Sequence, residues 1–231
     1  MSIWTRLTEA IAALARGEGL WALFDRLRPA TPPEKSVAFT IAVIALGAKM
    51  AKADGTVTRD EVTAFRRVFT LPPGEEAHAA RVFNLARQDV AGFELYASRI
   101  AAMFPGDEGR PVLTDLMEVL FAISMADGAY HAAEDAFLAE VARRLNIGDP
   151  CFRAIRARFV PDTPRDPYDV LGIPPTATLD EARAAWRAAV MDTHPDRMLA
   201  RGVPQEALRL AERRLIAVNA AWEEISGKRA A

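Results

Sequence analysis

The sequence is poor in the side chains on which most metal, redox and nucleophilic sites depend. Cys151 is its only cysteine, so the chain can form no internal disulfide and offers no second thiolate to a zinc site. Its three histidines are far apart, and it has neither a Gly-rich phosphate loop nor a nucleophile with an evident base beside it. We therefore do not expect an enzyme, and a lone cysteine fits a reducing cytoplasm.

Excess charge and long apolar runs are also lacking. The formal net charge of -2 removes the basic field with which proteins attract nucleic acids. The longest apolar run, residues 37–48, has only about half of the roughly 20 residues that a membrane-spanning helix needs. The helical spacing of apolar residues in segment 4–14 favours docking on the rest of the protein over lying on a membrane surface. We expect a cytoplasmic protein, free or peripheral at the inner face of the membrane.

The alternation of polar and apolar residues that marks half-buried strands is absent, and helical patterns fill the chain, which predicts an all-α fold. Proline-rich breakers divide it. We expect an N-terminal helical segment at 1–30, a helical domain at 31–160, a linker at 161–165 and a smaller domain at 166–231. Helices in the larger domain are expected near 36–52, 58–69, 75–89, 92–103, 111–126, 134–145 and 150–158.

The larger domain contains an internal repeat. The turn Asp54-Gly55, followed by Glu61, returns as Asp127-Gly128, followed by Glu134, and an apolar stripe of the same spacing precedes both turns. Each half therefore reads as a helix, an Asp-Gly turn and a second helix. The domain should be a bundle of two pseudo-repeated halves.

The two turns could serve as helix caps or as a metal site. Their Asp-Gly-x5-Glu spacing equals the second half of an EF-hand loop, but the first half offers residues such as Met50 and Lys52 where calcium needs oxygen ligands. Caps are the favoured reading, because glycine can end a helix in the left-handed conformation and Thr58 with Glu61 has capping-box spacing. His131 is a poorer cap than Thr58, so the second copy is less well explained.

These paired Lys-Ala-Asp-Gly and Met-Ala-Asp-Gly turns, each with a following Glu, resemble the TerB family of tellurite-resistance-type helical domains over roughly residues 31–160. The resemblance implies an all-α pseudo-twofold bundle whose acidic turn residues lie close together and can hold a divalent ion. It makes Asp54, Glu61, Asp127 and Glu134 the candidate metal ligands.

From Asp166 onward, the helix caps, the helix-ending residues and the apolar periodicity all predict the same arrangement of helices. Asp166 and Pro167 suit the start of a short helix that Gly172 ends, and Thr178 with Glu181 has the spacing of a capping box. A second long helix with an apolar three-four repeat should start at Pro204 and pack antiparallel to the first. This hairpin would leave the connecting loop 194–197 exposed at one end.

This segment resembles the J domain of DnaJ-type co-chaperones, and its DjlA subgroup in particular, through Asp166-Pro167-Tyr168-Asp169-Val170-Leu171-Gly172-Ile173, the helix bearing Ala185-Trp186-Arg187, and the His194-Pro195-Asp196 tripeptide. The resemblance implies binding to a DnaK-type heat-shock chaperone and stimulation of its ATP hydrolysis, with the catalytic groups on the partner. The expected chaperone-binding residues are His194, Pro195, Asp196, Arg197, Arg183, Arg187 and Trp186.

The chain also departs from that family. Ala184 and Ala188 stand where basic residues are common, and the Gly/Phe-rich and cysteine-rich client-binding regions of general-purpose DnaJ proteins are absent, as is the spanning helix of DjlA. Arg183 and Arg187 could also form only a solvated helix face.

Two functions follow from the two resemblances. In the first, the protein is a co-chaperone whose TerB-like domain selects a client, a location or a self-association partner. In the second, it is a TerB-type metal- or stress-responsive binding protein with a vestigial J domain. The first function requires Asp196, whereas the second requires Asp54 and Asp127.

Overall fold

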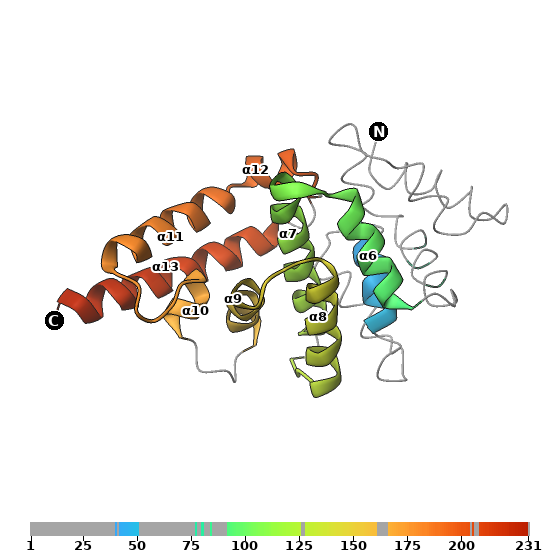
Figure 1. Ribbon diagram of the computed structural model, residues 1–231, viewed down its shortest axis with the longest axis horizontal. Helices are drawn as coiled ribbons and strands as arrows, with labels where there is room; N and C mark the ends of the chain where they lie inside the picture. The colour runs from blue at the N-terminus through green and yellow to red at the C-terminus, as the bar shows by residue number, and fades with distance from the viewer. Residues whose placement is uncertain are drawn as a thin grey trace.

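The computed structural model describes residues 40, 42–50, 77, 80, 84, 92–125, 128–160, 166–203, 205 and 208–230. Residues 42–50 are helical. The labelled helices are α6 (Phe93–Met103), α7 (Gly106–Ser124), α8 (Ala132–Arg144), α9 (Asp149–Phe159), α10 (Pro167–Leu171), α11 (Leu179–Asp192), α12 (Pro195–Ala200) and α13 (Arg209–Ala230) (Figure 1). No strand occurs among these residues, so the predicted all-α class is confirmed.

Helix α7 forms the centre of the larger core. Its buried side chains include Leu116, Met117, Leu120 and Phe121, and they share one hydrophobic cluster with residues of the 42–50 helix, α6, α8 and α9. The ring of Phe121 lies 5.5 Å from that of Phe152, centroid to centroid. Each fully buried side chain of this size contributes about 1.5–3 kcal/mol, so α7 is the scaffold on which the other helices pack.

The structure corrects one predicted helix start. The helix expected from Pro111 begins at Gly106 instead, with Pro105 as its N-cap, and Pro111 lies inside it. Gly106 has a φ of 72°, which glycine tolerates and which lets the chain turn into the helix immediately after Pro105. The proline lacks the N–H that would donate to the carbonyl of residue 107, so it interrupts the ladder without ending the helix.

Helices α10, α11 and α13 form the smaller, C-terminal part. Helices α11 and α13 lie side by side and run in opposite directions, as predicted, with α10 packed against both (Figure 1). Asp166 accepts a hydrogen bond from the backbone N–H of Tyr168 at 2.9 Å, and Gly172 ends α10 with a φ of 69°. Thr178 and Glu181 form the expected capping box at the start of α11.

The two parts share their apolar interiors. Met198, Val203, Leu210 and Ala211, from the C-terminal part, belong to the same hydrophobic cluster as α7. Ala157 of α9 in turn belongs to the cluster of the α11–α13 hairpin. Met198 of α12 is therefore buried in the same cluster as α7, so α12 does not stand free at the end of the hairpin. None of the helices in the described part of the chain is long and apolar enough to cross a membrane.

Candidate functional site

The tripeptide His194-Pro195-Asp196 begins the short helix α12 rather than lying in an open loop. Pro195 is at its first position, where its missing N–H leaves no bond unmade. The Nδ1 atom of His194, the N-cap, accepts a hydrogen bond from the backbone N–H of Asp196 at 3.2 Å. Both side chains face solvent, with 61% of His194 and 87% of Asp196 exposed. The local sequence thus builds a rigid turn that presents an imidazole and a carboxylate.

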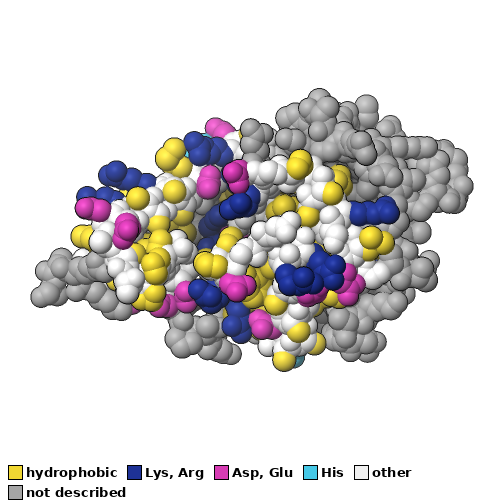
Figure 2. All heavy atoms as spheres, viewed as in Figure 1, with side chains coloured by type: hydrophobic (Ala, Val, Ile, Leu, Met, Phe, Trp, Pro, Cys, Tyr) yellow, Lys and Arg dark blue, Asp and Glu magenta, His cyan; other side chains and the backbone are white. Residues whose placement is uncertain are grey.

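The other expected binding residues lie on α11 and α12. Arg183 and Arg187 are exposed and one turn apart on α11, and Arg183 lies over the ring of Trp222 at 5.7 Å. The guanidinium of Arg197 is 3.6 Å from the carboxylate of Asp192. Figure 2 shows basic side chains over α11 and α12, with acidic side chains beside them.

Trp186 differs from the other expected binding residues because it is packed into the hairpin. It is half-buried and stacks on Trp222 with ring centroids 5.4 Å apart. Its indole N–H donates to the Oδ1 atom of Asn219 at 2.8 Å. Trp186 therefore joins α11 to α13 and helps to hold in place the helix that bears Arg183 and Arg187.

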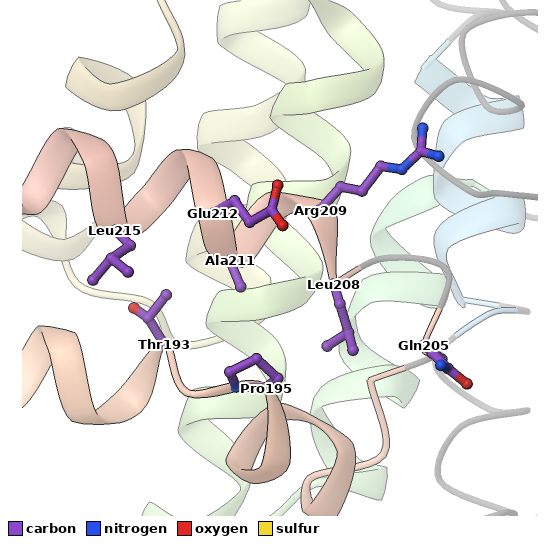
Figure 3. Close-up of a pocket in the computed structure, with 8 residues that line it drawn as sticks. All are labelled: Thr193, Pro195, Gln205, Leu208, Arg209, Ala211, Glu212 and Leu215. Atoms are coloured by element: carbon purple, nitrogen blue, oxygen red, sulfur yellow. The ribbon is translucent and has the colours of Figure 1, made fainter.

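An open pocket of about 520 Å³ lies beside the tripeptide. Its wall on one side comes from Thr193 and Pro195 and on the other from Leu208, Ala211 and Leu215 of the following segment (Figure 3). The pocket is completed by Gln205, Arg209 and Glu212. It places an apolar recess next to the exposed His194 and Asp196.

A buried ionic network joins α7 to the segment that carries the tripeptide and to α13, and it was not predicted from the sequence. Asp115 of α7, 1% exposed, accepts hydrogen bonds from Nη2 and Nε of Arg201 at 2.8 and 3.1 Å and from Nη1 of Arg214 at 3.2 Å. Nη2 of Arg201 also donates to the backbone carbonyl of Asp192 at 3.0 Å. Burial raises the pKa of Asp115 to about 6, although Arg214 and Arg201 act to lower it.

Glu118, one turn later on α7, extends the network. Its Oε1 atom accepts a hydrogen bond from Arg158 of α9 and lies 3.4 Å from Nε of Arg214. Arg158 also donates to the carbonyl of Val170 at 3.3 Å, which ties α9 to α10. The only sequence signal for this network is the pair of acidic residues inside the apolar stripe of α7, because their partners are far away along the chain.

The predicted metal site is largely outside the described residues. Asp54, Glu61 and Asp127 fall there, so the structure places only Glu134, whose carboxylate accepts the backbone N–H of His131 at 2.9 Å and caps α8. Gly128 adopts the left-handed conformation expected of a cap, with a φ of 88°. Among the described residues, no group of three or more His, Cys, Asp or Glu side chains is arranged to hold a metal ion.

Two known protein families match the chain, one over its larger helical part and one over its C-terminal part. The family described as tellurite resistance protein TerB matches residues 40–157, which is about half of the chain, and the DnaJ domain matches residues 166–230.

Several curated relatives are similar along most of their length. A co-chaperone protein DjlA from Photobacterium profundum is 27% identical over 223 residues, which cover 85% of this chain and 79% of that protein. A DjlA from Shewanella oneidensis is 28% identical over 196 residues, covering 78% and 74%. The DjlA of Escherichia coli K12 is 21% identical over 266 residues, covering 97% of both chains. No solved structure matches the chain.

Proposed function

Because this chain belongs to the TerB family and is a DjlA-like J-domain co-chaperone, we propose that it binds a DnaK-type heat-shock chaperone in its ATP state and stimulates ATP hydrolysis. The hydrolytic groups belong to the chaperone. This chain contributes a docking surface made of the tripeptide and the arginines of α11 and α12.

The exposed turn at His194-Pro195-Asp196 carries this proposal. Asp196 has most of its carboxylate in solvent, so it can accept a two-point hydrogen bond from an arginine of the partner. The Nδ1 atom of His194 is engaged by its own helix, which leaves Nε2 for the partner. Because Pro195 fixes the backbone between them, little conformational entropy is lost when both side chains are held.

The arginine face supports the first encounter. Arg183, Arg187 and Arg197 would steer the protein towards an acidic surface of the chaperone. Since Ala184 and Ala188 add no charge, we expect weaker or more selective docking than a fully basic face would give. Trp186 contributes by holding α11 on α13.

The TerB-family domain then provides client, location or self-association specificity. It offers no client-binding zinc region, and the chain contains no Gly/Phe-rich linker. We place the protein in the cytoplasm, free or at the inner face of the membrane.

The experiment that tests the docking proposal is single-turnover ATP hydrolysis by the DnaK-type chaperone of the same cell. Asp196→Asn should abolish the stimulation that the intact protein gives, because it removes a charge from an exposed contact without altering the turn. Asp107→Asn removes the same charge from a carboxylate that is 94% exposed on α7, and it should leave stimulation unchanged. Stimulation that survives in Asp196→Asn, or that is absent in the intact protein, would refute the proposal.

A further inference from the structure

None of the residues in the ionic network between α7 and the hairpin belongs to the proposed docking surface. Asp115 and Glu118 are each 1% exposed, and Arg201 and Arg214 are 13% and 12% exposed. Burying charges carries a desolvation cost that is often as large as the attraction it gains, so such pairs are poor evidence of a purely stabilising role. Their geometry indicates another purpose.

Arg201 closes the segment that carries the tripeptide. Its guanidinium binds the carbonyl of Asp192, the last residue of α11, while Arg201 itself directly follows α12. One planar group therefore fixes both ends of segment 193–200. The same guanidinium forms two hydrogen bonds to Asp115, so this closed segment is attached to α7.

Arg214 attaches α13, the second long helix of the hairpin, to the same carboxylate. It donates to the other oxygen of Asp115 from α13. One oxygen of Asp115 thus holds the segment before α13 through Arg201. The other oxygen holds α13 itself through Arg214. The fork of a guanidinium imposes direction as well as distance, which a lysine in either position would not.

We propose that Asp115, in the TerB-family part of the chain, is a positioning residue for the chaperone-binding tripeptide and acts through Arg201. The TerB-family domain then does more than select partners: it sets the orientation in which His194 and Asp196 are presented. A ligand or partner that shifts α7 would change the stimulation of the chaperone without touching the tripeptide. This inference rests on the proposed function for its biological meaning, but the positioning itself can be measured without the chaperone.

The charge of Asp115 depends on pH, which gives a second way to change its bonds to the arginines. The groups that face it are Arg201, Arg214 and Glu118, with Arg158 beside Glu118 and Asp192 beside Arg201. With a pKa raised by burial to about 6, its carboxyl is ionised at about pH 7.5 and mostly protonated at about pH 5.5. Protonation removes the charge that strengthens both arginine hydrogen bonds.

The first test records amide ¹H–¹⁵N spectra of the full-length protein and of Asp115→Asn, Arg201→Gln and Thr114→Val. Thr114 is a buried polar residue next to Asp115 on α7, and its hydroxyl donates to the carbonyl of Arg110 in the same helix at 3.0 Å, which makes it a matched control. The amide signals of His194, Asp196 and Arg197 should shift in both network variants and stay in place in Thr114→Val. Unmoved signals in folded Asp115→Asn and Arg201→Gln would overturn the inference.

The second test measures single-turnover ATP hydrolysis against the concentration of each protein. Asp115→Asn should raise the half-saturating concentration by about 2- to 30-fold, the range for residues in a coupling network. The ratio between Asp115→Asn and wild type should approach one at about pH 5.5, since wild type then carries an uncharged residue 115 too. Both proteins retain the same tripeptide, so an effect of pH on the docking residues themselves cancels from the ratio.

The two tests separate the inference from the proposed function. If Asp196→Asn has no effect on hydrolysis but the spectra shift as expected, the chaperone proposal fails and the positioning role stands. If Asp196→Asn abolishes stimulation while Asp115→Asn and Arg201→Gln stimulate like wild type at every pH, the positioning role is refuted and the chaperone proposal stands.

Discussion

Replacing Asp115 by asparagine should change how the free energy of unfolding depends on pH. Asp115 is fully buried between two arginines, and its folded-state pKa of about 6 lies above the ordinary value of 3.8. The folded protein therefore holds this proton more tightly than the unfolded chain does. Lowering the pH favours the folded state through this group, and the contribution is nearly absent above about pH 7 and complete only below 3.8.

The size of the effect follows from the two pKa values. Their difference corresponds to at most about 3 kcal/mol, and about 1 to 2 kcal/mol of it develops between about pH 7.5 and about pH 5. Asparagine resembles the protonated carboxyl and cannot titrate. The free energy of unfolding of wild type minus that of Asp115→Asn should therefore rise by about 1 to 2 kcal/mol over this interval.

Urea unfolding followed by far-ultraviolet circular dichroism, at both pH values, measures this difference. Thr114→Val removes a buried hydroxyl of the same helix but no titrating group, so its difference from wild type should be the same at both pH values. A difference for Asp115→Asn that falls as the pH is lowered would refute the reasoning. It would mean that the attraction of Arg201 and Arg214 outweighs the burial of the carboxylate.

Three further substitutions test the hairpin, each by thermal unfolding. Thr178→Ala removes the acceptor of the Glu181 backbone N–H and should cost about 1 kcal/mol, and a cost near zero would show that this cap is not needed. Gly172→Ala meets no atom closer than 3.9 Å, so a loss of about 1 kcal/mol would come from the left-handed backbone alone, and unchanged stability would exclude such strain. Trp186→Phe keeps an aromatic ring but loses the hydrogen bond to Asn219, with an expected loss of about 1 kcal/mol, and a neutral result would mean that water replaces this bond.

Sequence reasoning succeeded where structure is decided locally. The cap at Asp166, the end of α10 at Gly172 and the capping box at Thr178 each depend on residues within a few positions of one another, and each was found as predicted. The tripeptide was placed correctly between the two long helices. It was predicted as a loop, whereas Pro195 and the cap of His194 start a helical turn there.

Long-range pairing could not be predicted from the sequence. Asp115 and Arg201 are 86 positions apart, and nothing in either local pattern points to the other. The predicted start of α7 at Pro111 was wrong, because Pro105 and Gly106 start the helix earlier and Pro111 is tolerated inside it. The predicted metal ligands Asp54, Glu61 and Asp127 remain predictions, while Glu134 acts as a cap in the structure.

The shared apolar interior has a consequence for how the molecule comes apart. Since Met198, Val203 and Leu210 pack in one cluster with α7, separating the C-terminal helices from the rest would expose apolar surface on both sides. We expect these parts to melt together in one cooperative transition, and a fragment starting at Asp166 to be less stable than the same helices in the full chain. We therefore expect this J domain to unfold as part of one cooperative unit with α7, and not to behave as an interchangeable module.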